Sequence, residues 1–141
     1  MREKRSPKEV FKLLRLKNTN TRLENNPELL GWLRYTMTYR DMMGGSKWYP
    51  DGEIYLRLLK VAPEAQLATF FQSLRNIPDL KVVGENLQKT QYAHWRTFGM
   101  QPRDLAKSLG IMKLLESGAV KSDPRYLIYD GYLSFSKIKL D

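Results

Sequence analysis

The sequence predicts an all-α helical bundle of about six to eight short helices, because almost every apolar stretch has helical spacing and none alternates persuasively with period two. A second observation is a repeated phrase. Residues 6–16 return as residues 101–111, with proline, base, acid, aliphatic, Lys and Leu at the same places. A unit that returns after 95 residues (102 minus 7, counted between the prolines) indicates a segment of a modular array. Array proteins usually act as surfaces that hold partners.

The first two helices begin with the same device. Ser6 can cap a short helix that starts at Pro7, where the missing N–H of proline costs nothing. Asn26 and Pro27 start the second helix in the same way, and the residues between the two helices form a polar connection. Gly44 and Gly45 are predicted to end the second helix.

The middle of the chain predicts two further helices. A loop at 47–52 carries two aromatic residues, and a helical stretch begins near Asp51 with apolar residues Ile54, Leu56, Leu58 and Leu59. Pro63 interrupts this stretch, so it is either two helices or one helix with a sharp bend.

The last third repeats the opening. A helix over about 80–98 ends at Gly99, and Pro102 opens the second copy of the first helix. A polar connection over 117–123 precedes a last helix that starts at Pro124. The downstream echo places Tyr129 where the first copy has Trp32.

Composition excludes several classes of protein. The 141 residues suit one domain with a real core, and 42% hydrophobic against 28% charged residues is an ordinary globular balance. The chain has no Cys, and its single His94 cannot build a zinc site without partners. We therefore expect no disulfide, no metal and no cofactor. No apolar run approaches the length of a membrane span, so no integral membrane segment is expected.

The net charge of +9 is concentrated near the N-terminus. Such a patch can contact nucleic acid, acidic lipid or an acidic protein surface. The alternative, which we favour, is a solvated polar face or a linker to a preceding module. The start of the chain has no apolar core, so no signal peptide is expected in the chain as given, and a leader would lie outside it.

Three motifs in order carry a family resemblance. Residues 7–16 have the pattern Pro-x-x-Val-Phe-x-x-Leu-x-Leu, residues 26–35 read NPELLGWLRY, and residues 87–99 read LQKTQYAHWRTFG and lead into Pro102. These resemble the L, W and Y motifs of oomycete RXLR effectors, followed by the next L motif. The order covers most of the chain.

The resemblance implies a helical bundle of WY/LWY type, with one full L-W-Y unit and the start of a second. It divides the chain into a basic arm over 1–5, an L-W-Y-L unit over 6–111 and a partial W-like helix with a C-terminal cap over 112–141. Trp32 and Tyr92 are expected to be the pair of aromatic residues that pack in the core. Trp95 is the alternative to Tyr92 for the main core position on its helix. The other expected core residues are Phe11, Leu14, Leu105 and Leu109.

The resemblance also implies a role. Such proteins are secreted by plant pathogens, enter host cells and bind host proteins to suppress immunity, and some dimerise. We expect a host plant protein as partner, a possible homodimer and no enzymatic activity. The alternative is a basic all-helical nucleic-acid-binding domain, which we do not favour. The Arg-x-Leu-Arg motif and a secretion signal are not present in this chain, and the second W-like helix has Tyr129 in place of tryptophan.

Aromatic residues outside the expected core are the candidates for partner binding. Trp48 and Tyr49 lie in the 47–52 loop, and exposed aromatics are common anchors at interfaces. The alternative is that both fold back to close the end of the bundle. Tyr129 and Tyr132 of the last helix are further candidates. No catalytic residue is proposed, since His94 on a helix beside Trp95 is more often structural.

Overall fold

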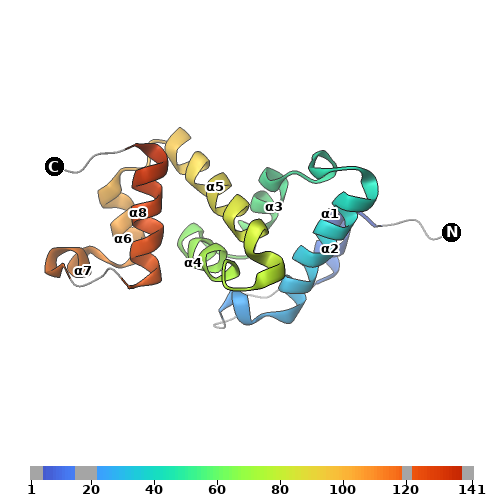
Figure 1. Ribbon diagram of the computed structural model, residues 1–141, viewed down its shortest axis with the longest axis horizontal. Coiled ribbons are helices and arrows are strands. Elements are labelled where there is room, and N and C mark those ends of the chain that lie inside the picture. The colour runs from blue at the N-terminus through green and yellow to red at the C-terminus, as the bar shows by residue number, and fades with distance from the viewer. Residues whose placement is uncertain (1–4, 15–21, 119–121, 138–141) are drawn as a thin grey trace.

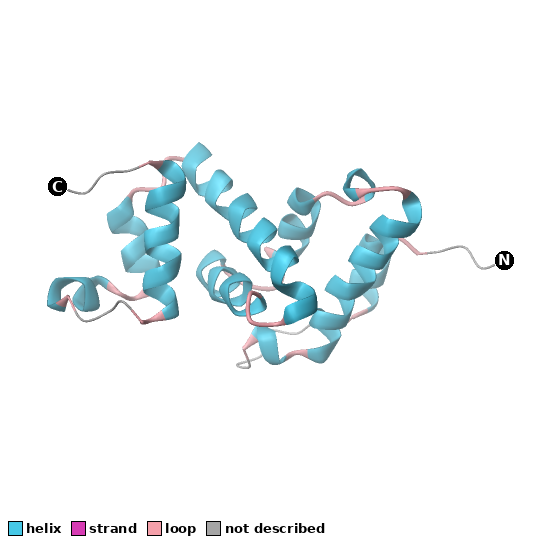
Figure 2. Cartoon of the chain, in the orientation of Figure 1, coloured by secondary structure: helices cyan, strands magenta, loops and turns pink. Residues whose placement is uncertain are grey.

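The computed structural model describes residues 5–14, 22–118 and 122–137, and these residues are helical with no strand among them (Figures 1 and 2). The α-helices of this described part are α1 (Pro7–Leu13), α2 (Pro27–Met43), α3 (Asp51–Leu58), α4 (Glu64–Leu74), α5 (Lys81–Thr97), α6 (Pro102–Leu109), α7 (Met112–Ser117) and α8 (Pro124–Ser136). Short 3-10 helices occupy Leu23–Asn25, Ser46–Trp48 and Pro78–Leu80. The predicted all-α class is confirmed.

The predicted helix starts are confirmed by their caps. The Ser6 hydroxyl accepts a hydrogen bond from the Glu9 amide, and the Asn26 side chain accepts one from the Leu29 amide at 3.2 Å. Asp123 does the same for α8. Each cap is followed by proline at the first helical position, so sequence-local chemistry sets where these three helices begin.

Pro63 separates two helices rather than bending one, because α3 ends at Leu58 and α4 begins at Glu64. At the end of α2, Gly44 has φ 106° and closes the helix in the left-handed region. The sequence did not predict α7. It is six residues long and lies within a stretch that carries no cap or proline signal.

The first hydrophobic cluster joins α1 to α5 and is centred on Trp32. This side chain is 1% exposed, and its ring centroid lies 4.8 Å from that of Phe11. Its indole nitrogen donates to the Pro7 carbonyl at 2.8 Å, so α2 also holds the start of α1 in place. Leu14 is only partly buried at the edge of this cluster.

The second cluster joins the C-terminal half of α5 to α6 and α8. Tyr92 and Trp95 are 5% and 2% exposed and both belong to it, together with buried Leu105 and Leu109. The Tyr92 hydroxyl donates to the Ile128 carbonyl at 2.9 Å. Helices α6 and α8 therefore lie at one end of the molecule, α1 and α2 at the other, and α3 to α5 between them (Figure 1).

Trp32 and Tyr92 are both buried, as expected, but they do not pack against each other as a pair. The two residues belong to different clusters. The reason is the length of α5, whose 17 residues span about 25 Å. Val83 and Leu87 near its start face the first cluster, whereas Tyr92 and Trp95 near its end face the second.

The repeat has a direct physical counterpart. The Tyr35 hydroxyl donates to the Arg5 carbonyl, and the Tyr132 hydroxyl donates to the Met100 carbonyl at 2.8 Å. Arg5 and Met100 each lie two residues before the proline that opens the repeated phrase. The same tyrosine-to-carbonyl hydrogen bond thus ties α1 to α2 in the first copy and α6 to α8 in the second.

Helices α4 and α5 lie close together at Gly84. A Cβ atom at this position would lie 2.7 Å from the Leu74 Cβ and 3.0 Å from the Phe71 carbonyl oxygen. Glycine is normally unfavourable inside a helix, so here its lack of a side chain is what permits the packing.

Replacing Trp32 with alanine is expected to destabilise the fold by about 3–5 kcal/mol, because it empties a fully buried site. Denaturant unfolding measures the change. The matched control is Trp48→Ala, which removes a tryptophan that is 46% exposed and should cost far less. Equal losses for the two variants would contradict the placement of Trp32.

Gly84→Ala is expected to destabilise by about 1–3 kcal/mol through overpacking against Leu74 and Phe71. Gly31→Ala in α2 is the control, since a Cβ there meets nothing within 4 Å. That change should stabilise by up to about 1 kcal/mol through helix propensity. Thermal unfolding of both variants gives the two signs, and a stabilising Gly84→Ala would refute the close contact.

Candidate interaction surface

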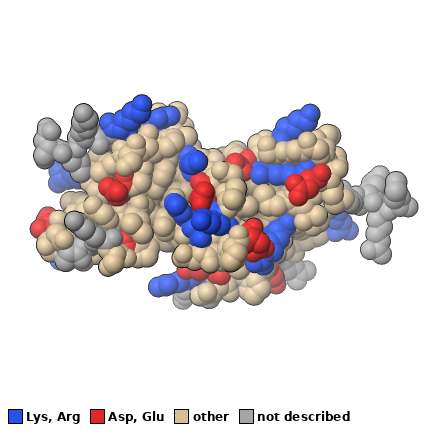
Figure 3. All heavy atoms as spheres, in the orientation of Figure 1, with Lys and Arg blue, Asp and Glu red and all other residues tan. Residues whose placement is uncertain are grey.

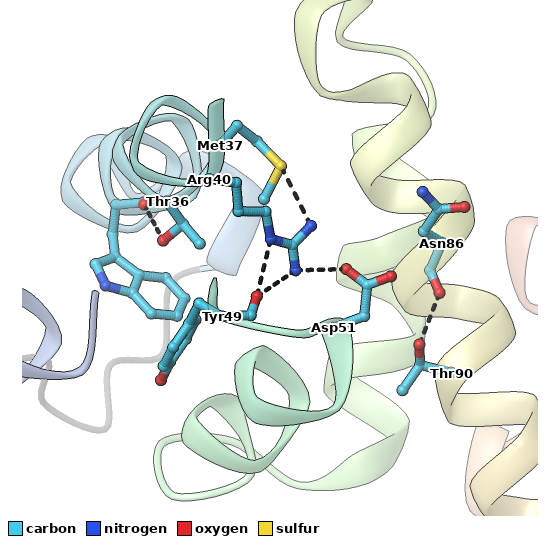
Figure 4. Close-up of polar contacts among 8 residues, drawn as sticks. Thr36, Met37, Arg40, Tyr49, Asp51, Asn86 and Thr90 are labelled. Carbon is cyan, nitrogen blue, oxygen red and sulfur yellow. Dashed lines mark hydrogen bonds and ion pairs between the residues drawn. The ribbon is translucent and has the colours of Figure 1, made fainter. Parts of the chain in front are cut away.

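The segment between α2 and α3 is held by a buried arginine (Figure 4). The Arg40 guanidinium donates to the Tyr49 carbonyl from Nε at 2.8 Å and from Nη2 at 2.6 Å. Nη2 also lies 2.8 Å from the Asp51 carboxylate. Three hydrogen bonds from one planar group fix both ends of Tyr49-Pro50-Asp51 relative to α2. These contacts, which we call the arginine clamp, give the segment Tyr49-Pro50-Asp51 a defined shape.

Trp48 directly precedes this fixed segment. It is 46% exposed at the end of the 3-10 helix Ser46–Trp48, next to the clamped Tyr49 carbonyl. A large aromatic side chain on a rigid support loses little conformational entropy when it binds, which suits an interface anchor. Of the four aromatic residues proposed for partner binding, Trp48 is the one whose side chain is substantially exposed.

Tyr49 does not fit that expectation. It is 7% exposed, and its ring meets the Trp32 ring edge-on with centroids 6.3 Å apart. Burial raises the pKa of its hydroxyl. The reason is the arginine clamp, which pulls the Tyr49 backbone toward α2 and turns the ring into the first cluster. Tyr49 matches the alternative of closing the bundle end.

The expectation that Tyr129 and Tyr132 are available to bind a partner does not hold either. They are 7% and 1% exposed, which leaves little of either ring for a partner. Both face the second cluster because α8 packs on α4, α5 and α6. They belong to the packing of the second copy.

His94 is held among neighbours. Its Nε2 lies 3.5 Å from the Glu64 carboxylate, and its ring is tilted by 50° against the Phe98 ring with centroids 4.7 Å apart. Among the residues that the structure describes, no three His, Asp or Glu side chains are grouped so that they could hold a metal ion. Likewise, no helix in this described part is long and apolar enough to span a membrane.

Two family models match adjacent parts of the chain. Residues 38–89 match the WY domain of RXLR phytopathogen effector proteins, and residues 1–36 match the WY domain described for effector PexRD54. The chain belongs to the WY-domain family of RXLR effectors. The resemblance expected from the L, W and Y motifs is thereby confirmed, and the all-α fold is the one that this family has.

Curated relatives of this WY-domain chain come from two Phytophthora species. RxLR effector protein Avh331 of Phytophthora sojae (strain P6497) is 26% identical over 93% of this chain and 46% of its own length. RxLR effector protein PexRD18 of Phytophthora infestans (strain T30-4) is 32% identical over 90% of this chain and 27% of its own length. RxLR effector protein 54 of the same strain is 32% identical over 63% of this chain and 23% of its length.

The WY-domain chain therefore spans between about a quarter and a half of the curated relatives that it matches. No solved structure gave a significant match.

The arginine clamp was missed at the sequence level, although a signal was present. Arg40 lies four residues after Thr36 and eight after Trp32, which places a cation on the core-facing stripe of α2. A buried arginine needs a partner, and Asp51 follows within one loop length. Neither observation specifies that the Tyr49 carbonyl is the main acceptor.

Arg40→Lys is expected to lower the free energy of unfolding by about 1.5–3 kcal/mol, because an ammonium cannot reproduce the planar fork on a carbonyl and a carboxylate. The control is Arg34→Lys on the same helix, where the ion pair with Asp79 is exposed and should contribute nothing measurable. Chemical denaturation of both variants tests the clamp. If the two variants were indistinguishable, the loop would be held by other contacts.

Proposed function

We propose that this chain is a module of a secreted virulence effector that enters the host plant cell, binds a host protein and suppresses immunity. Family membership supports the effector role, and the exposed Trp48 next to the clamped segment supports binding through a surface. The relatives carry the RxLR effector name, which supports secretion by the pathogen. A homodimer is compatible with this role.

The proposed module works without catalysis. His94 is the only histidine, and it is engaged by Glu64 and Phe98, which is typical of a structural residue. Fold alone does not give function, so the argument rests on the surface. The unit over 6–111 supplies the folded support in this proposal, and 112–141 caps it. Residues 1–4 of the basic arm lie outside the described residues.

The net charge of +9 favours a second candidate function, that of a nucleic-acid-binding domain. On the face in Figure 3, however, Lys and Arg side chains are interleaved with Asp and Glu side chains rather than gathered into one basic surface. A mobility-shift titration with duplex DNA and with RNA at low salt tests this candidate. Binding that weakens steeply with salt would support it, and a flat titration would eliminate it.

Trp48→Ala is expected to abolish or greatly reduce capture of a host protein from plant extract while leaving the thermal unfolding transition nearly unchanged. An anchor aromatic at an interface commonly accounts for more than about 2 kcal/mol of binding, or a loss of roughly thirtyfold. Quantitative mass spectrometry of the captured proteins is the measurement.

The matched control is Val82→Ala, which trims an exposed apolar side chain on the first turn of α5, away from the clamped segment. Host proteins that wild type and Val82→Ala capture and Trp48→Ala does not are the expected partners. Equal capture by all three would remove Trp48 from the interface. Failure of wild type to enrich any host protein over an unrelated helical bundle would count against the binding role itself.

A further inference from the structure

A groove separate from Trp48 lies between α3 and α5. It has a volume of about 450 Å³ and begins at Pro50, two residues after Trp48. Leu56 of α3 forms part of one wall, and His94 and Phe98 form part of the other. The two helices pack side by side over this part of the molecule (Figure 1).

Two large apolar side chains stand exposed at the rim. Leu56 is 51% exposed and Phe98 is 76% exposed. Leu56 is one of the apolar residues of the helical stretch that begins near Asp51, but unlike Ile54 and Leu58 it is not buried. Two helical positions separate it from each buried neighbour, and this turns it about 200° around α3, away from the core. Exposed apolar side chains gathered around one hollow indicate an interaction site rather than random surface.

The groove wall is preorganised by a small hydrogen-bond network. Gln91 is fully buried, and its amide nitrogen donates to the Glu64 carbonyl at 2.9 Å and contacts the Tyr55 hydroxyl at 3.4 Å. The Tyr55 hydroxyl donates in turn to the Glu64 carboxylate at 3.3 Å. Burial raises the pKa of Tyr55, so this hydroxyl stays protonated as a donor at physiological pH. A hollow held in this way does not have to be ordered when a ligand binds.

The charge of the groove is opposite to that of the chain. Among its lining residues Glu53 is the only acid, and no Lys or Arg lines it. The Glu64 carboxylate, 40% exposed, lies beside His94 at the wall. On a chain of net charge +9, an apolar hollow that is bordered by carboxylates and lined by no Lys or Arg complements a cationic ligand.

We propose that the α3–α5 groove binds a segment of a host protein that carries a bulky apolar side chain within about four residues of a Lys or Arg. The apolar side chain fills the hollow between Leu56 and Phe98, and the cation pairs with Glu53 at the rim. This inference rests on the proposed function and deepens it, because it names the chemistry of the segment that the module recognises.

The test uses a random twelve-residue peptide display library as the probe, panned against the wild-type chain. The enriched peptides are then synthesised, and their affinities are measured by fluorescence polarisation. We expect enriched sequences to pair Leu, Phe or Trp with a nearby Lys or Arg. Affinity should fall at least about tenfold in the double variant Leu56→Ser/Phe98→Ser and in Glu53→Lys.

Each variant has a matched control. Val82→Ser removes an exposed apolar side chain from the first turn of α5, at the opposite end of that helix from Phe98. Glu28→Lys reverses an exposed acid in the first turn of a helix, as Glu53 is. Both controls should bind the peptides within about twofold of wild type. All substituted side chains are exposed, so circular dichroism and thermal unfolding should be unchanged in every variant.

Any one of four results would overturn the proposal. The first is that the enriched peptides lack basic residues. The second is that they bind the groove variants as tightly as they bind wild type. The third is that panning on wild type enriches no peptide relative to panning on Leu56→Ser/Phe98→Ser. A dimer of wild type in sedimentation that the double variant loses would also overturn it, since the occupant would then be a second copy of the chain.

Failure of the groove and failure of the effector role give different results. If both wild type and the double variant capture the same host protein from plant extract, the groove proposal fails and host binding stands. If the peptides bind as expected but wild type captures no host protein, the groove chemistry stands and the proposed function fails.

Discussion

The packing of α5 against α4 is the constraint on which the rest of the structure depends. At Gly84 the backbones approach so closely that even one methyl group would collide with Leu74. This contact sets the course of α5, whose first half then closes one cluster around Trp32 and whose second half opens another around Tyr92. The two clusters form one molecule because α4 and α5 both contribute residues to each of them.

Local chemistry made much of the fold predictable. Cap-and-proline pairs predicted the starts of α1 and α2, and Pro124 predicted the start of α8. Pro63 and the glycines predicted helix ends, since these signals act within a few residues. The separation of Trp32 and Tyr92 into two clusters was not predicted, because it depends on where a long helix crosses its neighbours. The exposed Leu56 shows the same limit, since helical spacing alone does not say which face of a short helix is covered.

The surface was harder to predict than the core. Trp48 and Tyr49 are adjacent in one loop and were equally plausible as anchors, yet one is half exposed and the other is buried. Arg40, nine residues before Tyr49, decides between them by binding the Tyr49 backbone rather than any side chain. A pattern search for complementary side chains does not detect an interaction of this kind. The α3–α5 groove also depends on helices that only the fold brings together.

The tyrosine that ties each pair of repeated helices binds a backbone oxygen, at Arg5 in one copy and at Met100 in the other. The two acceptor residues have unrelated side chains, and the bond does not sense them. The tie between the two helices of each copy therefore tolerates almost any side chain at the acceptor position. As a result, the residue that leads into each copy of the repeated phrase can differ while the two helices of that copy stay joined.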